Sequence, residues 1–290
     1  MRSIFFLLAV FLFSPARLHA TGNPPILANG SLGIVLSRGL VTYPIREGVW
    51  QAKIAPAYVS QKDSRGGEEV DMSGAGFGAA LTYGLSDHWG LNFIAGYVKI
   101  TGDRSLSVDY TQGDNPPEAG KIFQTPKAVP SSGNVHPGEA KGFSLLVNLI
   151  WDHWSGDGFR MPVYFGTGFM QAEGDVETAT GLKRDGKTSS PVITLGLGPS
   201  FRVKRFRFGG FFLLSGPIGG GKGTFVDFDP ATGAVNSSLE FDITNDPLES
   251  GAGIFGLEAI YLPWGLSVGY SPPIEGGTSI SLKWSREWGG

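Results

Sequence analysis

The sequence contains no cysteine among its 290 residues, so a disulfide framework and a thiolate metal site are both excluded. Charged residues are scarce, at 17% of the chain, yet the many aromatic and β-branched residues are not those of a disordered protein. No apolar run approaches the roughly 20 residues that a membrane-spanning helix needs. What the chain has in excess is glycine, 45 residues without a collagen period.

The first 20 residues have the three parts of a secretory signal peptide. Arg2 supplies a positive charge, Ile4 to Phe13 form a short apolar core, and Ala20 is a small residue at the expected cleavage point. Cleavage there removes both Arg2 and Arg17, and the loss of these two positive charges takes the formal charge from −3 to −5. We therefore predict a mildly acidic exported protein with no footprint for nucleic acid.

Beyond residue 48 the chain alternates with a period of two, which predicts β-strands with two different faces. Within residues 75–85 one face carries Phe77, Leu81 and Tyr83, whereas the other consists of Gly, Ala and Thr. The solvated face of a soluble sandwich would carry many Lys, Glu and Thr residues. Large residues outside and small ones in a crowded interior are instead typical of a barrel in lipid.

We predict an all-β, membrane-spanning, antiparallel up-and-down β-barrel of about ten strands, with eight and twelve as alternatives. The strands are expected near 49–60, 72–85, 89–100, 142–152, 159–171, 190–203, 205–215, 250–262, 264–272 and 277–288. Short and long connections alternate, as in bacterial outer-membrane barrels. Residues 1–20 are then the signal peptide, 21–48 a periplasmic lead, a plug or extra strands, and 49–290 the barrel.

The tryptophans are a separate indication of the same architecture. Six of the seven fall at the strand ends that bear the short connections, where an interfacial belt is expected. These are Trp50, Trp89, Trp151, Trp154, Trp264 and Trp288, and only Trp284 lies deeper.

The chain resembles the Gram-negative outer-membrane β-barrel class. The resemblance rests on the signal peptide, the hairpin "AALTYGLSDHWGLNF" (Ala79–Phe93) and the aromatic last strand "SISLKWSREW" (Ser279–Trp288). It implies location in the cell outer membrane, contact with its lipid and lipopolysaccharide, and insertion by the barrel-assembly machinery. Gly289 and Gly290 depart from the terminal aromatic of that class. The tract "YGLSDHWGL" is also similar to a hairpin of phenol-degradation-pathway transporter-like barrels.

Three motifs carry weaker signals. The stretch Ser215–Thr224, "SGPIGGGKGT", is one residue away from a P-loop, but Gly223 occupies the magnesium-binding position and no helical pattern follows. We assign it to an external loop, with the acidic residues after it as a solvated surface. His88, His136 and His153 are spread over both rims, so we expect neither a catalytic residue nor a metal or cofactor site.

Proline and glycine interrupt several predicted strands. Pro56, Pro162, Pro191 and Pro199 lie in or near them, and each removes a ladder donor that a closed barrel needs. The phase of alternation also breaks at Gly209-Gly210, which predicts a bulge.

Charged and polar residues on the small-residue face are the candidate functional set. We expect these side chains to point into the barrel: Lys53, Asn92, Asn148, Arg160, Arg202, Arg207, Glu258 and Lys283. If the lumen is wet, they form a narrow pore for small solutes that favours anions. If Glu258 pairs with the cations, they form a salt-bridged plug.

The sequence thus predicts a monomeric, non-enzymatic barrel that acts as a narrow channel for small solutes. The alternative is a closed barrel that displays the long loops 101–141 and 216–249. A hydrolase at the outer rim, with His136 in its site, is the third hypothesis.

Overall fold

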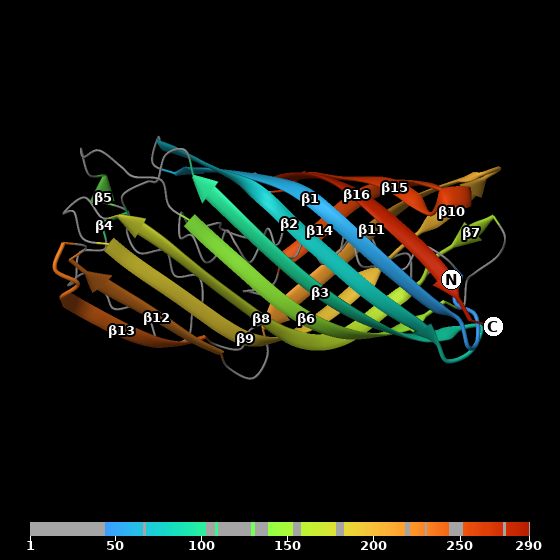
Figure 1. Ribbon diagram of the computed structural model, residues 1–290, viewed down its shortest axis with the longest axis horizontal. Helices are drawn as coiled ribbons and strands as arrows, with labels where there is room; N and C mark the ends of the chain where they lie inside the picture. Colours follow the sequence, from blue (N-terminus) through green and yellow to red (C-terminus); the bar gives the residue numbers. More distant parts are fainter. Residues whose placement is uncertain are drawn as a thin grey trace, which may run out of the picture.

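The computed structural model is a closed antiparallel β-barrel of ten strands, which confirms the predicted fold class (Figure 1). It describes residues 44–65, 68–102, 108–109, 129–130, 139–152, 158–177, 183–217, 221–229, 231–243, 252–274 and 277–289. The signal peptide and residues 21–43 therefore lie outside the described residues. No helix in the described ranges is long and apolar enough to cross a membrane.

The wall consists of ten long strands, each paired with the next along the barrel. They are β1 (Trp50–Arg65), β2 (Glu68–Gly84), β3 (Trp89–Gly102), β6 (Glu139–Trp151), β8 (Val163–Glu177), β9 (Lys183–Leu197), β11 (Phe206–Pro217), β14 (Ala252–Tyr261), β15 (Leu266–Ile274) and β16 (Gly277–Trp288). The last strand pairs with the first, from Trp50↔Trp288 onward, and this pairing closes the barrel.

The two ends of the barrel differ in their connections. We call one the short-turn end, because it carries the connections 85–88, 204–205 and 262–265, the last of which includes the 3₁₀ turn η1 (Leu262–Trp264). The C-terminus lies at this end (Figure 1). The opposite, long-loop end carries β4 (Val108–Asp109) paired with β5 (Val129–Pro130), within the predicted loop 101–141.

The alternation of the sequence becomes the two faces of the wall. Along β2, Phe77 is exposed on the outside, whereas Gly76, Gly78 and Ala80 are buried inside. The same parity holds on β3, where Phe93 and Tyr97 are exposed and the residues between them are buried. A one-residue slip would exchange these faces, so the pattern also fixes the register.

Each of the four prolines lies at a position where the ladder of the wall is interrupted, so that no backbone N–H is needed there. Pro162 and Pro199 fall in breaks that split off two short strands, β7 (Phe159–Arg160) and β10 (Ser200–Val203). Pro56 coincides with a gap in the β1–β16 ladder, which resumes beyond it in the same register. Pro191 lies on β9 between the segment paired with β11 and the segment paired with the next hairpin.

The predicted bulge at Gly209-Gly210 is wrong. β11 pairs with β14 without a register shift from Phe206↔Tyr261 to Ser215↔Ala252. The pattern is misleading because Phe211 is a large residue that points inward and is buried. It is accommodated by its register partner Gly256, where an added Cβ would overlap the phenyl ring.

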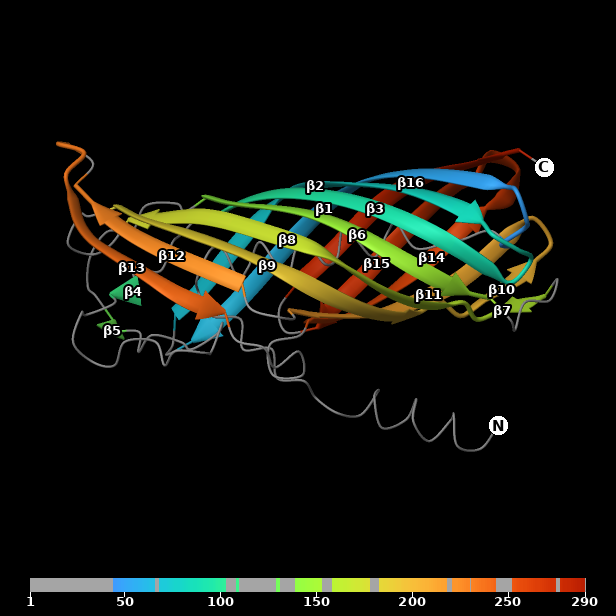
Figure 2. The same cartoon turned by 90° about the horizontal axis from the view of Figure 1, so that it is seen from below.

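The predicted loop 216–249 contains a hairpin that the sequence prediction missed. β12 (Gly221–Phe228) and β13 (Val235–Ile243) pair with each other, and β12 also pairs with the far half of β9. The wall therefore continues past the closed barrel at the long-loop end (Figure 2). Lys222, Gly223 and Thr224 of the P-loop-like stretch lie in β12, so they are strand residues and not part of a loop.

Candidate functional site

The interior near the short-turn end is polar and charged. Six of the predicted residues are at most 4% exposed there: Lys53, Asn92, Asn148, Arg160, Arg207 and Lys283. Glu258 is slightly more open, with 12% of its side chain exposed. These side chains come from six strands of the wall and from the short strand β7, so the site exists only in the closed barrel.

Lys283 and Glu258 form a two-point ion pair across β15. The Lys283 Nζ lies 2.5 Å from one carboxylate oxygen of Glu258 and 2.7 Å from the other. Their strands, β16 and β14, both pair with β15 at Ser267↔Lys283 and Glu258↔Gly269. Gly269 presents no side chain between the two groups, so the lysine can reach the carboxylate over the strand that separates them.

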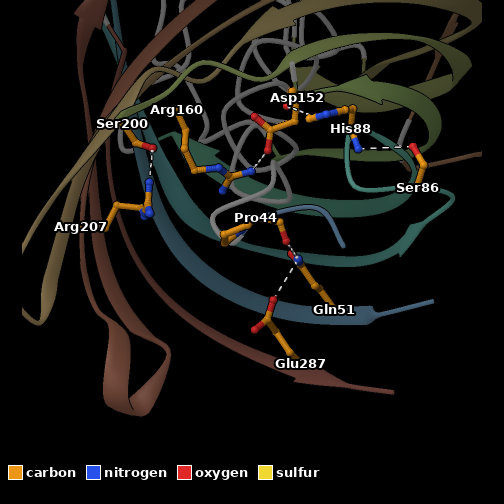
Figure 3. A network of polar contacts seen from close by, with 9 residues as sticks. All are labelled: Pro44, Gln51, Ser86, His88, Asp152, Arg160, Ser200, Arg207 and Glu287. Atoms are coloured by element: carbon orange, nitrogen blue, oxygen red, sulfur yellow. Dashed lines mark hydrogen bonds and ion pairs between the residues drawn. The ribbon is translucent and has the colours of Figure 1, made fainter. Parts of the chain in front are cut away.

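A second ion pair joins Arg160 and Asp152, both at most 1% exposed (Figure 3). Asp152 directly follows β6, and its backbone N–H donates to the carbonyl of His88 at 2.8 Å. The sequence analysis missed Asp152, although its parity on β6 matches that of the inward residues Asn148 and Ile150. Strand parity applied to the last residue of the predicted strand 142–152 would have found it.

Gln51 and Glu287 extend the polar network to the mouth of the short-turn end (Figure 3). The Gln51 Nε2 donates to a carboxylate oxygen of Glu287 at 3.1 Å and to the carbonyl of Pro44 at 2.9 Å. Both residues share the parity of the inward residues on their strands, Lys53 on β1 and Lys283 on β16. They were likewise missed.

Asn148 is linked to Thr194 across β8. The Thr194 hydroxyl donates to Asn148 Oδ1 at 2.6 Å, and the residue of β8 between them in register is Gly166. A Cβ at Gly166 would lie 2.4 Å from that same amide oxygen. Glycine here makes room for a hydrogen bond between two strands that do not pair.

Arg202 differs from the other predicted interior residues because it is exposed. It is the register partner of Arg207 and shares its face, but it stands at the rim and donates from Nε to the carbonyl of Lys204 at 3.1 Å. Arg207 lies deeper and donates from Nη1 to the Ser200 hydroxyl at 3.1 Å (Figure 3). The prediction that Arg202 is enclosed in the barrel is therefore wrong.

Above this polar layer, toward the long-loop end, the interior becomes apolar. The buried side chains at this level include Val59, Val98, Ile100, Leu146, Met170, Val192, Phe211 and Leu213. Around them the wall is lined with buried glycine, alanine and serine on β1, β2, β15 and β16. The barrel thus has a charged layer at one end and a small, apolar interior above it.

The exterior carries two aromatic belts, eight residues apart along the strands. The belt at the short-turn end includes the register pairs Trp50↔Trp288 and Trp89↔Trp151, and the second includes Tyr58, Phe77, Tyr97 and Phe143. The indole rings of Trp89 and Trp151 stack with their centroids 6.1 Å apart. Eight residues on a strand tilted by about 40° rise roughly 20 Å, close to the apolar band of a bacterial outer-membrane barrel.

Exposed Phe, Leu, Val and Ile side chains fill the surface between these belts, and an apolar band between two aromatic girdles is the lipid-facing surface of a transmembrane barrel. The chain is an outer-membrane β-barrel. Trp154 lies outside the described residues. The other five tryptophans predicted for the short-turn rim lie at strand ends or in the turn η1, and Trp284 lies deeper, within β16.

Among solved structures this outer-membrane barrel is similar to several of low identity. The translocator domain of the autotransporter NalP from Neisseria meningitidis is 11% identical, with 90% of this chain and 94% of that chain covered, at a TM-score of 0.47. OprG from Pseudomonas aeruginosa is 13% identical, with 84% and 98% covered, at 0.42. The protease OmpT from Escherichia coli is 11% identical, with 86% and 97% covered, at 0.42.

No family model and no curated protein matches the sequence of this barrel. Because each TM-score is below 0.5, the membrane assignment rests on the exterior described above, and the matches favour no particular activity.

Of the three histidines that the sequence places outside the signal peptide, the structure describes His88. His136 and His153 lie outside the described residues, and the Nδ1 of His88 lies 3.4 Å from the Asp152 carbonyl in a turn of the short-turn end. Within the described ranges, no three His, Cys, Asp or Glu residues gather as metal ligands. Asp227, Asp229, Glu240 and Asp242 lie in the β12–β13 hairpin beyond the barrel.

Proposed function

We propose that the barrel is a narrow, passive channel for small solutes, without catalytic activity and without a cofactor. The observation that supports this proposal is the charged interior layer. Enclosed ion pairs such as Lys283–Glu258 add little to stability, because desolvation offsets their attraction, and apolar packing would serve a mere anchor at least as well. Charged groups in the interior are useful when ions or polar solutes must pass them.

The charge of this layer favours anions. Lys53, Arg160, Arg207 and Lys283 supply four cations, against the three carboxylates of Asp152, Glu258 and Glu287. We propose that the short-turn end faces the periplasm and that small anionic solutes pass the layer more readily than cations. Outer-membrane lipid, lipopolysaccharide and the barrel-assembly machinery are the other proposed partners.

Reversal potentials in planar bilayers test this selectivity. With the purified full-length barrel in a tenfold salt gradient, we expect a potential of the sign that anion preference requires. Arg207→Ala should shift it toward zero, because Arg207 is enclosed, whereas Arg202→Ala at the exposed rim should shift it less. Equal shifts, or a cation preference in the wild-type protein, would contradict the proposed role of the interior layer.

A second candidate is a closed barrel that displays its long-loop end. The pairs Lys283–Glu258 and Arg160–Asp152 neutralise each other, and the β12–β13 hairpin projects beyond the barrel (Figure 2). Both features would suit a scaffold for an exposed binding surface. A protein that inserts into bilayers but never conducts would favour this function over the channel.

A further inference from the structure

The chain enters the barrel wall from inside the mouth at the short-turn end. Ile45 is 3% exposed and belongs to the buried apolar cluster that includes Ile94, Ile150 and Tyr164. From there the backbone turns outward at Gly48, whose φ of +72° favours glycine, and Val49 N–H donates to the Arg46 carbonyl at 3.2 Å. Residues 44–48 form what we call the inturned segment.

The wall is shaped to receive this segment. A Cβ on Gly84 would overlap the carbonyl oxygen of Arg46, and a Cβ on Gly90 would lie 3.2 Å from Cδ1 of Ile45. Gly48 N–H donates to the Gly84 carbonyl at 3.0 Å, and the Gln51 side chain holds the Pro44 carbonyl (Figure 3). Two glycines and one glutamine therefore make a seat for the segment at the edge of the mouth.

The inturned segment meets the charged layer at this end through the hydrogen bond from Gln51 to the Pro44 carbonyl. Gln51, Asp152 and Arg160 lie beside the mouth, yet each is at most 1% exposed. The segment is also separable from the wall, because the ladders of β1 with β2 and with β16 both begin at Trp50. Its departure would break the contacts described above and the hydrogen bond from Glu47 N–H to Asp87 Oδ1, but no pair of the β1 ladders.

We propose that the inturned segment is a gate. In its seat it closes the short-turn mouth, and out of its seat it exposes the charged layer to solutes. This proposal rests on the proposed channel function and adds its regulation.

A disulfide tests the gate cleanly, because the chain has no cysteine of its own. The Cβ position of Gly90 lies 3.5 Å from Cγ2 of Ile45, so cysteines at these two positions are close enough to be bridged. In Ile45→Cys/Gly90→Cys we expect the oxidised barrel to open at least about tenfold less often than the same protein after reduction. Each single-cysteine variant should be insensitive to the reductant.

The opposite change should open the gate. Gly84→Ala places a methyl group against the Arg46 carbonyl, so the segment is expelled and the open probability in planar bilayers should rise. The matched control is Gly158→Ala at the same end, where an added Cβ meets no atom within 4 Å. Both proteins are first shown to be folded by the resistance of the barrel to unfolding in detergent without heat.

The outcomes separate this proposal from the channel function. Conduction that is the same in the oxidised and reduced double variant, or unchanged in Gly84→Ala, would overturn the gate and leave the channel standing. Silence of every folded variant in every redox state would overturn both.

Discussion

At the scale of single residues, the Lys283–Glu258 pair is the best place to test the charged interior. Glu258→Gln removes the carboxylate whose two oxygens both contact the Lys283 ammonium group. The buried ammonium group then loses its counter-ion. We expect the free energy of unfolding to fall by about 3–5 kcal/mol, as when one partner of a buried pair is removed. Urea titrations in lipid vesicles, followed by tryptophan fluorescence, measure this change.

The double variant Glu258→Leu/Lys283→Met is the control for that experiment. It replaces both ions by apolar groups, and its stability should return to within about 1–2 kcal/mol of the wild-type value. A single variant as stable as the wild-type protein would mean that the lysine is not confined to the position described.

Asp229, outside the membrane span, gives a pH-dependent prediction. Its carboxylate accepts the backbone N–H of Ala231 at 2.8 Å in the turn between β12 and β13, and this hydrogen bond lowers the pKa of Asp229 below its ordinary value. The pKa of Asp229 is lower in the folded than in the unfolded protein. The ionised Asp229 therefore stabilises the turn fully above its unfolded pKa, and this stabilisation is lost as the pH falls through its folded pKa. Exchange of the Ala231 amide should accelerate across that acidic range in the wild-type protein and be pH-insensitive, after correction for intrinsic rates, in Asp229→Ala.

At the scale of strands, the seam between β14 and β15 has the shortest ladder of the ten-stranded wall. The two pair only from Leu257↔Tyr270 to Tyr261↔Leu266, although β14 begins at Ala252 and β15 continues to Ile274. Pro272 and Pro273 lack the N–H groups that would extend this ladder. We expect amides of residues 252–256 that face β15 to exchange at least about tenfold faster than those of the same stretch that face β11. Equal rates on the two sides would contradict an open seam.

Period-two alternation was sufficient to predict the ten strands, because each has one face against lipid and one inside. It failed where an inward-facing side chain is large although most residues on that face are small, as Phe211 is beside Gly256. It also failed at β12–β13, which lie beyond the barrel and need no lipid-facing side. The turn Asp229–Gly233, with φ of +70° at Gly233, lies between two β-prone runs and was the available signal for that hairpin.

At the scale of the whole molecule, six of the charged or amide residues selected by parity are buried, but parity could not say which of them would meet. Arg160 meets Asp152 because both lie at the same rim, and Lys283 meets Glu258 across β15, where the register partner of Glu258 is Gly269. Arg202 has the inward parity but stands at the rim, where parity no longer determines burial. The inturned segment had no periodic signal at all, because one turn of irregular backbone has none.

The position of the bilayer on the barrel gives the last prediction. Phe93 lies midway between Trp89 in one belt and Tyr97 in the other, and all three side chains are about 42–43% exposed on the outside of β3. An arginine at the bilayer midplane costs about 2–4 kcal/mol in a transmembrane barrel, against about 0–1 kcal/mol near the interfaces. Phe93→Arg should therefore lower the free energy of unfolding in vesicles by at least about 1 kcal/mol more than Trp89→Arg or Tyr97→Arg. These three substitutions share one strand, one face and one introduced side chain, so they differ chiefly in depth and in the size of the ring removed. If Phe93→Arg were no more costly than the other two, the hydrocarbon core would not lie between the aromatic belts, and the charged interior layer would have to be placed at a different depth in the membrane.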